Sequence, residues 1–187
     1  MTVPTRIRTS AKAVVLHEGS VLLTRNIWNG REGRFLPGGG QETGELLPDT
    51  VRREVREETG LTVRVGPLLW VLEGWIDDPG PLAAENHHRV EIVFLCSVVG
   101  SPELLGGTEE DVDQIGLDWV PLEKIASLEN LSPRYRDHLA LLASGDIPRA
   151  SYLERQGVSL PDLASSGSRP PSGSRERRPS SGAPAGP

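Results

Sequence analysis

The sequence has little of several features that would assign it to a compartment or a class. Cys96 is the only cysteine among 187 residues, so no disulfide can form within the chain. No apolar run reaches the length that crosses a membrane. Met1 to Lys12 contains basic side chains but no adjoining apolar core of a signal peptide. These absences favour a cytoplasmic, reducing setting and argue against a membrane partner.

Basic charge is also scarce. The formal net charge is −6, which argues against the basic surface typical of proteins that bind duplex DNA. Residues 164–187 carry a net charge of +3, which leaves −9 on the rest of the chain. They contain no aromatic side chain and no aliphatic one larger than alanine, so they cannot form a core and are expected to be a disordered tail. An inert tail is favoured over one that contacts acidic partners or RNA.

The chemistry is concentrated in one stretch, Gly39 to Leu61. Its second half contains Glu54, Glu57 and Glu58, whose spacing of three and four residues puts them on one face of a helix. The same helix has an apolar stripe, made of Leu47, Val51 and Val55. At about 100° per residue the three acids lie along the border of this stripe, and the opposite side is rich in arginine.

These acids break two local rules of helix stability. Glu54 and Glu58 are like charges one turn apart, which costs roughly 0.2–0.5 kcal/mol. Glu57 and Glu58 also stand in the last turn, where the helix dipole disfavours anions. Conflicts of this kind are typical of functional sites, and carboxylates without soft ligands suit Mg²⁺ or Mn²⁺. On periodicity alone, a solvated helix with Arg–Glu pairs is an equally good interpretation.

The spacing of the whole stretch resembles a complete Nudix box. Five residues separate Gly39 from Glu45, and seven more precede Arg53-Glu54-Val55-Arg56-Glu57-Glu58-Thr59-Gly60-Leu61. Every fixed position of the pattern GX5EX7REUXEEXGU, where U is aliphatic, is filled. The preceding Leu36-Pro37-Gly38-Gly39-Gly40 also resembles the family's usual approach to the box. With this resemblance, the solvated-helix interpretation loses most of its support.

The resemblance implies an α/β (α+β) fold, namely the Nudix-type α/β/α sandwich with a mixed central sheet and a loop–helix–loop catalytic motif. It implies hydrolysis of a phosphoanhydride in a nucleoside diphosphate linked to another moiety, with a substrate of the nucleoside triphosphate or nucleotide-sugar type. The expected cofactor is Mg²⁺ or Mn²⁺, since an acidic site binds a diphosphate only through cations. The expected partner is this small-molecule substrate, and a homodimer is left open.

Site residues follow from the resemblance, position by position. The metal ligands would be Glu54, Glu57 and Glu58, with a backbone carbonyl at Gly38 or Gly39. Arg53 would orient a neighbouring glutamate, and Glu45 would support the loop. The general base would come from the box or from a downstream acidic loop, where Glu110 ranks ahead of Glu109, Asp111 and Asp113.

The sequence leaves alternatives open for both the substrate and the function. The family's sub-motifs for NADH, coenzyme A and ADP-ribose are not found at their usual offsets after Gly60, since Pro79 and Pro81 lie too far along the chain. A non-catalytic nucleotide-binding Nudix module that regulates a partner is disfavoured by the intact box. Prenyl diphosphate isomerisation would need a catalytic Cys96, whose apolar surroundings instead predict a buried, inert thiol.

The remaining sequence predicts four segments: an arm (1–5), the Nudix domain (6–145), a C-terminal extension (146–163) and the tail (164–187). Strands are expected at 7–16, 21–25, 35–36, 61–75, 89–99 and 115–120, and helices at 47–59 and 133–142. Loops are expected at 26–34, 76–86 and 100–113. The paired His87 and His88 are interpreted as a surface loop rather than a metal site.

Overall fold

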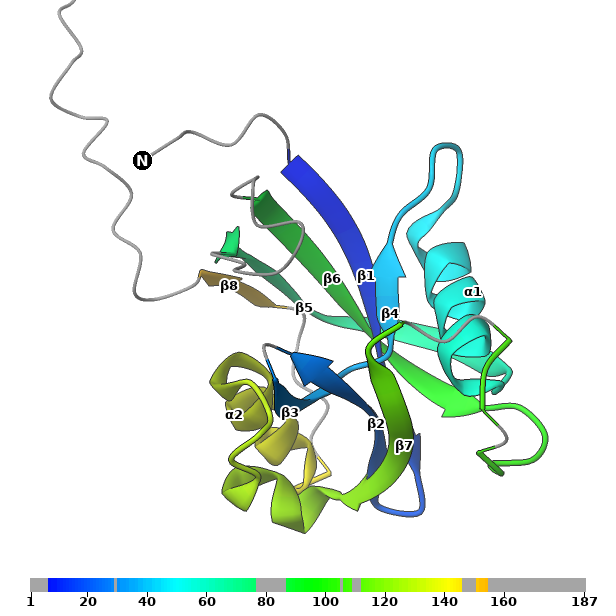
Figure 1. Cartoon of the computed structure of the whole chain (residues 1–187), viewed down its shortest axis with the longest axis vertical. Coiled ribbons are helices and arrows are strands. Elements are labelled where there is room, and N and C mark those ends of the chain that lie inside the picture. The colour runs from blue at the N-terminus through cyan, green and yellow to red at the C-terminus, as the bar shows by residue number, and fades with distance from the viewer. Residues whose placement is uncertain are drawn as a thin grey trace, which may run out of the picture. The chain divides into compact units, whose positions relative to one another are not determined.

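The structure is a computed structural model that describes residues 7–28, 30–76, 87–104, 106–108, 112–145 and 151–154. Its strands are β1 (Ile7–His17), β2 (Ser20–Trp28), β3 (Arg31–Phe35), β4 (Gly38–Gly40), β5 (Val63–Ile76), β6 (His87–Val98), β7 (Gln114–Pro121) and β8 (Ser151–Glu154). Its helices are α1 (Leu47–Thr59), α2 (Pro133–Leu142) and the 3-10 helix η1 (Leu122–Ser127). Figure 1 shows these elements in their spatial arrangement.

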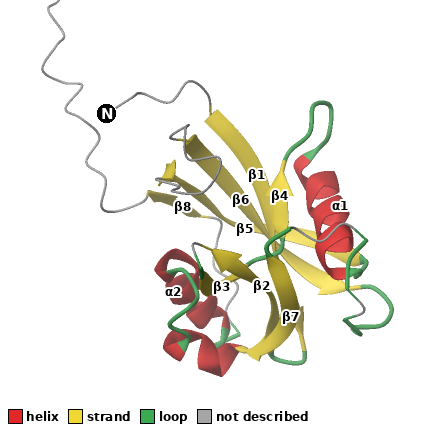
Figure 2. Ribbon diagram, viewed as in Figure 1, coloured by secondary structure: helices red, strands yellow, loops and turns green. Residues whose placement is uncertain are grey.

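The strands form one mixed sheet, drawn in yellow in Figure 2. Its order is β3-β2-β1-β6-β5-β8, with β4 paired to β1 and β7 paired to β2. The β1–β6 and β5–β8 pairs are parallel, and the other pairs are antiparallel. The mixed central sheet expected from the sequence is therefore confirmed.

Alternation along β1 divides the core into two layers. On one face, Ala11, Ala13 and Val15 are fully buried in a cluster with Val51 and Val55 of α1. On the other face, Val14 lies in a cluster that includes Tyr135 and Leu139 of α2. The sheet thus separates α1 from α2, which agrees with the α/β/α sandwich. Burying each valine of α1 stabilises the fold by about 1.5–3 kcal/mol, so core packing holds the helix in place.

The helix of the box begins and ends where the sequence predicts, at Leu47 and Thr59. Pro48 stands in its first turn, where its missing N–H is not needed. Glu58 is only 6% exposed. The prediction that an acid lies at the border of the core is therefore confirmed.

The predicted loop at 26–34 is wrong. Strand β2 continues to Trp28, and β3 begins at Arg31 as its antiparallel partner. Gly30, at φ +72°, stands in the turn between them, whereas Gly33 lies inside β3. Two glycines close together predict a loop, but only Gly30 lies in the turn, and Gly33 lies in the strand.

Two further predictions need correction or extension. His87 and His88 begin β6 instead of standing in a loop, and His88 Nε2 lies 2.5 Å from Glu73 Oε1 on β5. Strand β8, within the predicted C-terminal extension, has no strong sequence pattern and was not expected. Most of the predicted 76–86 loop lies outside the described residues, as do the arm and the tail.

Cys96 is 2% exposed and lies in the layer beneath α1. Burial raises the pKa of its thiol to about 12, so almost none of it is the reactive thiolate near neutral pH. The prediction of a buried cysteine is confirmed, and this environment argues against the isomerase alternative, which needs a reactive thiol. None of the helices in the described part of the chain combines the length and apolarity needed to span a membrane.

Candidate active site

The site begins at β4, which is antiparallel to β1. Three consecutive residue pairs join the two strands: Ser10 with Gly40, Ala11 with Gly39, and Lys12 with Gly38. Gly38 has φ +127°, and a Cβ there would overlap the carbonyl oxygen of Ala11. Only glycine fits this conformation at this close an approach. The strand therefore presents bare backbone to α1.

Two glutamates of α1 lie directly against that backbone. The Gly38 N–H donates to Glu58 Oε2 at 3.0 Å. A Cβ added to Gly39 would lie 2.5 Å from Glu54 Oε2, too close for any real contact. A side chain at Gly39 would therefore displace the Glu54 carboxylate. The glycines leave the space that these two carboxylates occupy.

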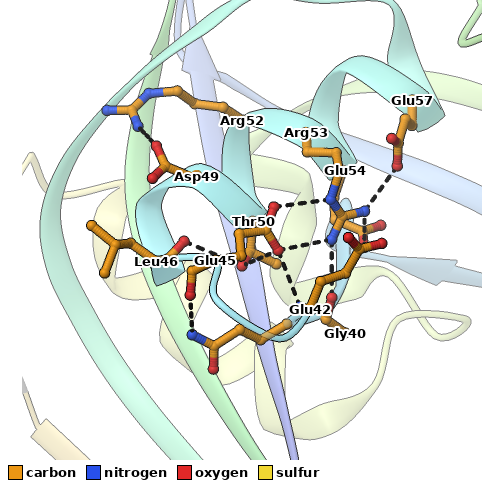
Figure 3. A network of polar contacts seen from close by, with 11 residues as sticks. Gly40, Glu42, Glu45, Leu46, Asp49, Thr50, Arg52, Arg53, Glu54 and Glu57 are labelled. Atoms are coloured by element: carbon orange, nitrogen blue, oxygen red, sulfur yellow. Dashed lines mark hydrogen bonds and ion pairs between the residues drawn. The ribbon is translucent and has the colours of Figure 1, made fainter.

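Arg53 connects the acids of the box through one guanidinium (Figure 3). Its Nε and Nη2 donate to the two oxygens of Glu45 at 2.9 and 3.1 Å. Its Nη1 donates to Glu54 Oε1 at 2.8 Å and to Glu57 Oε2 at 2.9 Å. Nη2 also reaches the Gly40 carbonyl at 3.0 Å. Arg53 thus contacts three glutamates, where the resemblance implied that it would orient one.

Glu45 ties the loop before α1 to the helix. Its Oε2 accepts a hydrogen bond from the Thr50 hydroxyl at 2.8 Å and from the Glu42 N–H at 3.2 Å. The hydrogen bonds from Arg53 are the main reason why the pKa of Glu45 falls to about 2. The same contact raises the pKa of Arg53. Glu45 is therefore a carboxylate that stays ionised and supports the loop, as its expected role requires.

Glu54 has the opposite environment. Burial raises its pKa, and the neighbouring charges of Arg53 and Lys12 only partly counteract this. A partly buried carboxylate beside other acids gains from a cation, and carboxylate oxygens are the ligands that hard divalent ions prefer. The residue types of Glu54, Glu57 and Glu58 therefore suit such an ion.

The carboxylates of Glu54, Glu57 and Glu58 do not form a complete metal site in this structure. Among the described residues, no three side chains of histidine, cysteine, aspartate or glutamate are arranged to hold a metal ion. Arg53 engages Glu54 and Glu57, and the Gly38 amide engages Glu58. A divalent ion would compete with these partners for the same oxygens.

The expected general base, Glu110, lies outside the described residues together with Glu109 and Asp111. The described residues on both sides of them contact the end of α1. The backbone of Gly107 is so close that a Cβ there would overlap the Glu57 carbonyl. Gln114 Nε2 donates to the Glu58 carbonyl at 2.9 Å. Both flanks of the acidic loop are thus anchored beside the glutamates of the box.

Comparison with known proteins decides the family. The model of the NUDIX domain matches residues 6–142, and these residues contain the box. The chain belongs to the Nudix family. Nudix hydrolases generally use divalent metal ions.

Individual Nudix relatives resemble this chain to different extents. An ADP-ribose pyrophosphatase of Methanocaldococcus jannaschii is 32% identical over 109 residues, which span 58% of this chain and 61% of that protein. The MutT protein from Methanosarcina mazei Go1 is 28% identical, with a TM-score of 0.60 over 77% of this chain and 98% of that one. An ADP-ribose pyrophosphatase from Streptococcus suis 89-1591, 20% identical with a TM-score of 0.56, shares the fold.

Sequence reasoning missed three contacts of this Nudix site. Lys12 Nζ donates to the Gly38 carbonyl, Thr50 supports Glu45, and Gln114 caps a carbonyl of α1. Lys12 alone left a signal, because it is the one charged residue in the otherwise apolar stretch from Ala11 to Leu16. The other two are ordinary polar residues, whose contacts depend on the fold.

Proposed function

We propose that this chain hydrolyses a phosphoanhydride bond in a nucleoside diphosphate linked to another moiety, of the nucleoside triphosphate or nucleotide-sugar type. The observation that carries the proposal is the row of glutamates on α1 that faces the bare backbone of Gly38 and Gly39. The space that the glycines leave is used by carboxylates, not by apolar packing. Such an arrangement serves chemistry rather than stability.

A diphosphate is an anion and would be repelled by these carboxylates alone. The proposal therefore includes Mg²⁺ or Mn²⁺, held by Glu54, Glu57 and Glu58 with a backbone carbonyl of Gly38 or Gly39. A bound ion of this kind neutralises phosphate oxygens and activates water. Within the chain, Arg53 positions Glu54 and Glu57, and Glu45 fixes Arg53.

Removal of the attacking water's proton is assigned to the acidic loop, with Glu110 as the first candidate. Its described neighbours Gly107 and Gln114 lie against the end of α1, which supports this assignment. A carboxylate within hydrogen-bond reach of water can act as a general base. ADP-ribose is included among the substrates to test because a relative 32% identical to this chain is named an ADP-ribose pyrophosphatase.

The test is a hydrolysis assay on the full chain, with metal stripped and then with Mg²⁺ or Mn²⁺ restored. The panel contains nucleoside triphosphates, nucleotide sugars, ADP-ribose, dinucleotides and capped RNA, and the readout is released monophosphate, phosphate and pyrophosphate. We expect turnover of at least one substrate with metal and none with chelator. Turnover without metal would contradict the proposal. Binding without hydrolysis, with metal present, would favour the non-catalytic Nudix module.

A further inference from the structure

Three polar residues of β1 lie beside β4, the strand made of Gly38 to Gly40. The proposed chemistry does not account for them. Arg8, Ser10 and Lys12 occupy alternate positions, so their side chains leave the same face of the strand. Ser10 pairs with Gly40 and Lys12 with Gly38. Arg8 lies two residues beyond this pairing, along the same row.

The two cations of this row reach back over β4. Lys12 Nζ donates to the Gly38 carbonyl, and Arg8 Nη2 lies 3.7 Å from where a Cβ of Gly40 would stand. Neither cation forms an ion pair with a carboxylate of the described residues. Since an ammonium has three donors, Lys12 keeps donors for an anionic ligand.

The residue between the cations, Ser10, has a hydroxyl without a hydrogen-bond partner in the described structure. Ser10 is 6% exposed. A buried hydroxyl without a partner costs free energy, so its presence between two cations needs an explanation. Beside Arg8, an open cavity of about 530 Å³ lies between residues 7–9 of β1 and residues 40–45 of the box loop. This space can receive part of a nucleotide.

We propose that Arg8 and Lys12 bind the phosphate oxygens of the substrate from β1, with the Ser10 hydroxyl between them as a further donor. The inference rests on the proposed function and deepens it. Because the side chains of Arg8, Ser10 and Lys12 leave the face of β1 away from α1, the glutamates of α1 and the cations of β1 would meet the diphosphate from either side of Gly38 to Gly40. Lys12 would contact the phosphate nearer Gly38, and Arg8 the part of the substrate in the cavity beside Gly40.

The variants Lys12→Met and Arg8→Met remove each charge and keep an unbranched side chain. Arg52→Met is the matched control, because Arg52 pairs with Asp49 on the exposed part of α1. The probe is α,β-methylene ADP, which the proposed reaction cannot cleave, titrated by calorimetry in Mg²⁺. We expect Lys12→Met to weaken binding at least tenfold and Arg8→Met several-fold. Arg52→Met should stay within twofold of the wild type, and Lys12→Arg should recover most of the affinity.

A second measurement separates phosphate binding from support of the metal site. Mn²⁺ binding without nucleotide is followed by electron paramagnetic resonance. Lys12→Met should bind Mn²⁺ as tightly as the wild type or more tightly, because a nearby positive charge has been removed. Weaker Mn²⁺ binding would assign Lys12 to the metal site and overturn the inference, as would analogue affinity within twofold of the wild type.

Melting curves accompany every variant, and Lys12→Gln replaces Lys12→Met if the latter does not fold. The two proposals fail differently. A wild type that hydrolyses a substrate, with variants whose KM is unchanged, contradicts only the role of Arg8 and Lys12. A wild type that neither hydrolyses any substrate nor binds the analogue contradicts both.

Discussion

Arg53 shows why a single residue type suits the centre of this site. One guanidinium donates to Glu45, Glu54, Glu57 and a backbone carbonyl at once. A lysine has three donors on a single nitrogen and cannot form the paired bonds to Glu45. The side chains involved are between 15% and 28% exposed, so solvent screens these charges only in part.

Substitution of Glu58 is expected to affect stability and turnover differently. Glu58→Gln keeps an oxygen that can accept from the Gly38 N–H and removes a charge that the helix dipole disfavours. We expect stability in chelator to stay within about 1 kcal/mol of the wild type, and turnover in Mg²⁺ to fall by orders of magnitude. Glu58→Ala, the control, also deletes the acceptor and should cost a further 1–3 kcal/mol, roughly. Melting curves in chelator and one rate assay suffice, and near-normal turnover with a large loss of stability would reject Glu58 as a ligand.

Glu45 predicts a dependence of stability on pH. Its pKa is about 2 in the folded protein, against an ordinary value of 4.5. Because the folded value is the lower one, Glu45 stabilises the fold above pH 4.5, and this contribution is lost as the pH falls toward 2. Denaturant unfolding in chelator should show wild type and Glu45→Gln converging across that range. A difference that stays constant from pH 6 to pH 2 would show that the Arg53 contact is not responsible.

At this scale, the sequence predicted the residues of the box but not their neighbours on β1. Glu45, Arg53 and the three glutamates follow from local spacing on one loop and one helix. Lys12 contacts Gly38 across 26 positions, because β1 pairs with β4 after an intervening hairpin. No local pattern encodes that pairing, so the row of Arg8, Ser10 and Lys12 appeared only in the structure.

Among the secondary-structure elements, α1 was the most predictable, since its apolar period, early proline and final glycine agree. Of strand β3, only its last residue, Phe35, is predicted from the sequence, because the segment from Arg31 to Phe35 contains no alternation of apolar and polar residues. It is a strand because it pairs with β2. Tertiary pairing therefore overrides local propensity at this point.

Substitutions at two of the three glycines of β4, Gly38 and Gly39, are expected to cause different defects. Gly38→Ala places a Cβ against the backbone of Ala11 at a positive φ, so we expect a loss of stability of roughly 1–3 kcal/mol or more. Gly39→Ala meets the far end of the Glu54 side chain instead. It should leave the fold largely stable and lower turnover and Mn²⁺ affinity. Melting temperature and Mn²⁺ titration distinguish the two, and equal loss of stability in both would contradict this assignment.

Substitutions at Glu110 and Glu109 in the predicted acidic loop are expected to lower turnover to different extents. If Glu110 is the general base, Glu110→Gln should lower turnover by a factor of about 10²–10⁴, with melting temperature and Mn²⁺ affinity unchanged. Glu109→Gln is the matched control, since it removes the same charge one position away and should have a small effect. Small, equal effects on turnover would move the base back into the box.

At the scale of the whole chain, charge is divided between a body of −9 and a final segment of +3. Attraction between opposite charges could dock residues 164–187, but the segment has no large apolar side chain to hold a contact. Exposed ion pairs alone contribute about 0–1 kcal/mol and are screened by salt. Composition therefore predicts that these residues add little to stability.

Two truncations test this prediction. Deleting residues 164–187 should leave turnover unchanged and shift the melting temperature by no more than about 2–4 °C, the shift that 1 kcal/mol gives in a domain of this size. Deleting residues 151–187 also removes β8, which pairs with Trp70 to Glu73 of β5, and should lower the melting temperature further. Melting curves at low and high salt are the measurement. If deleting residues 164–187 lowered the melting temperature by more than about 4 °C, and by less at high salt, the positively charged tail would bind the acidic body.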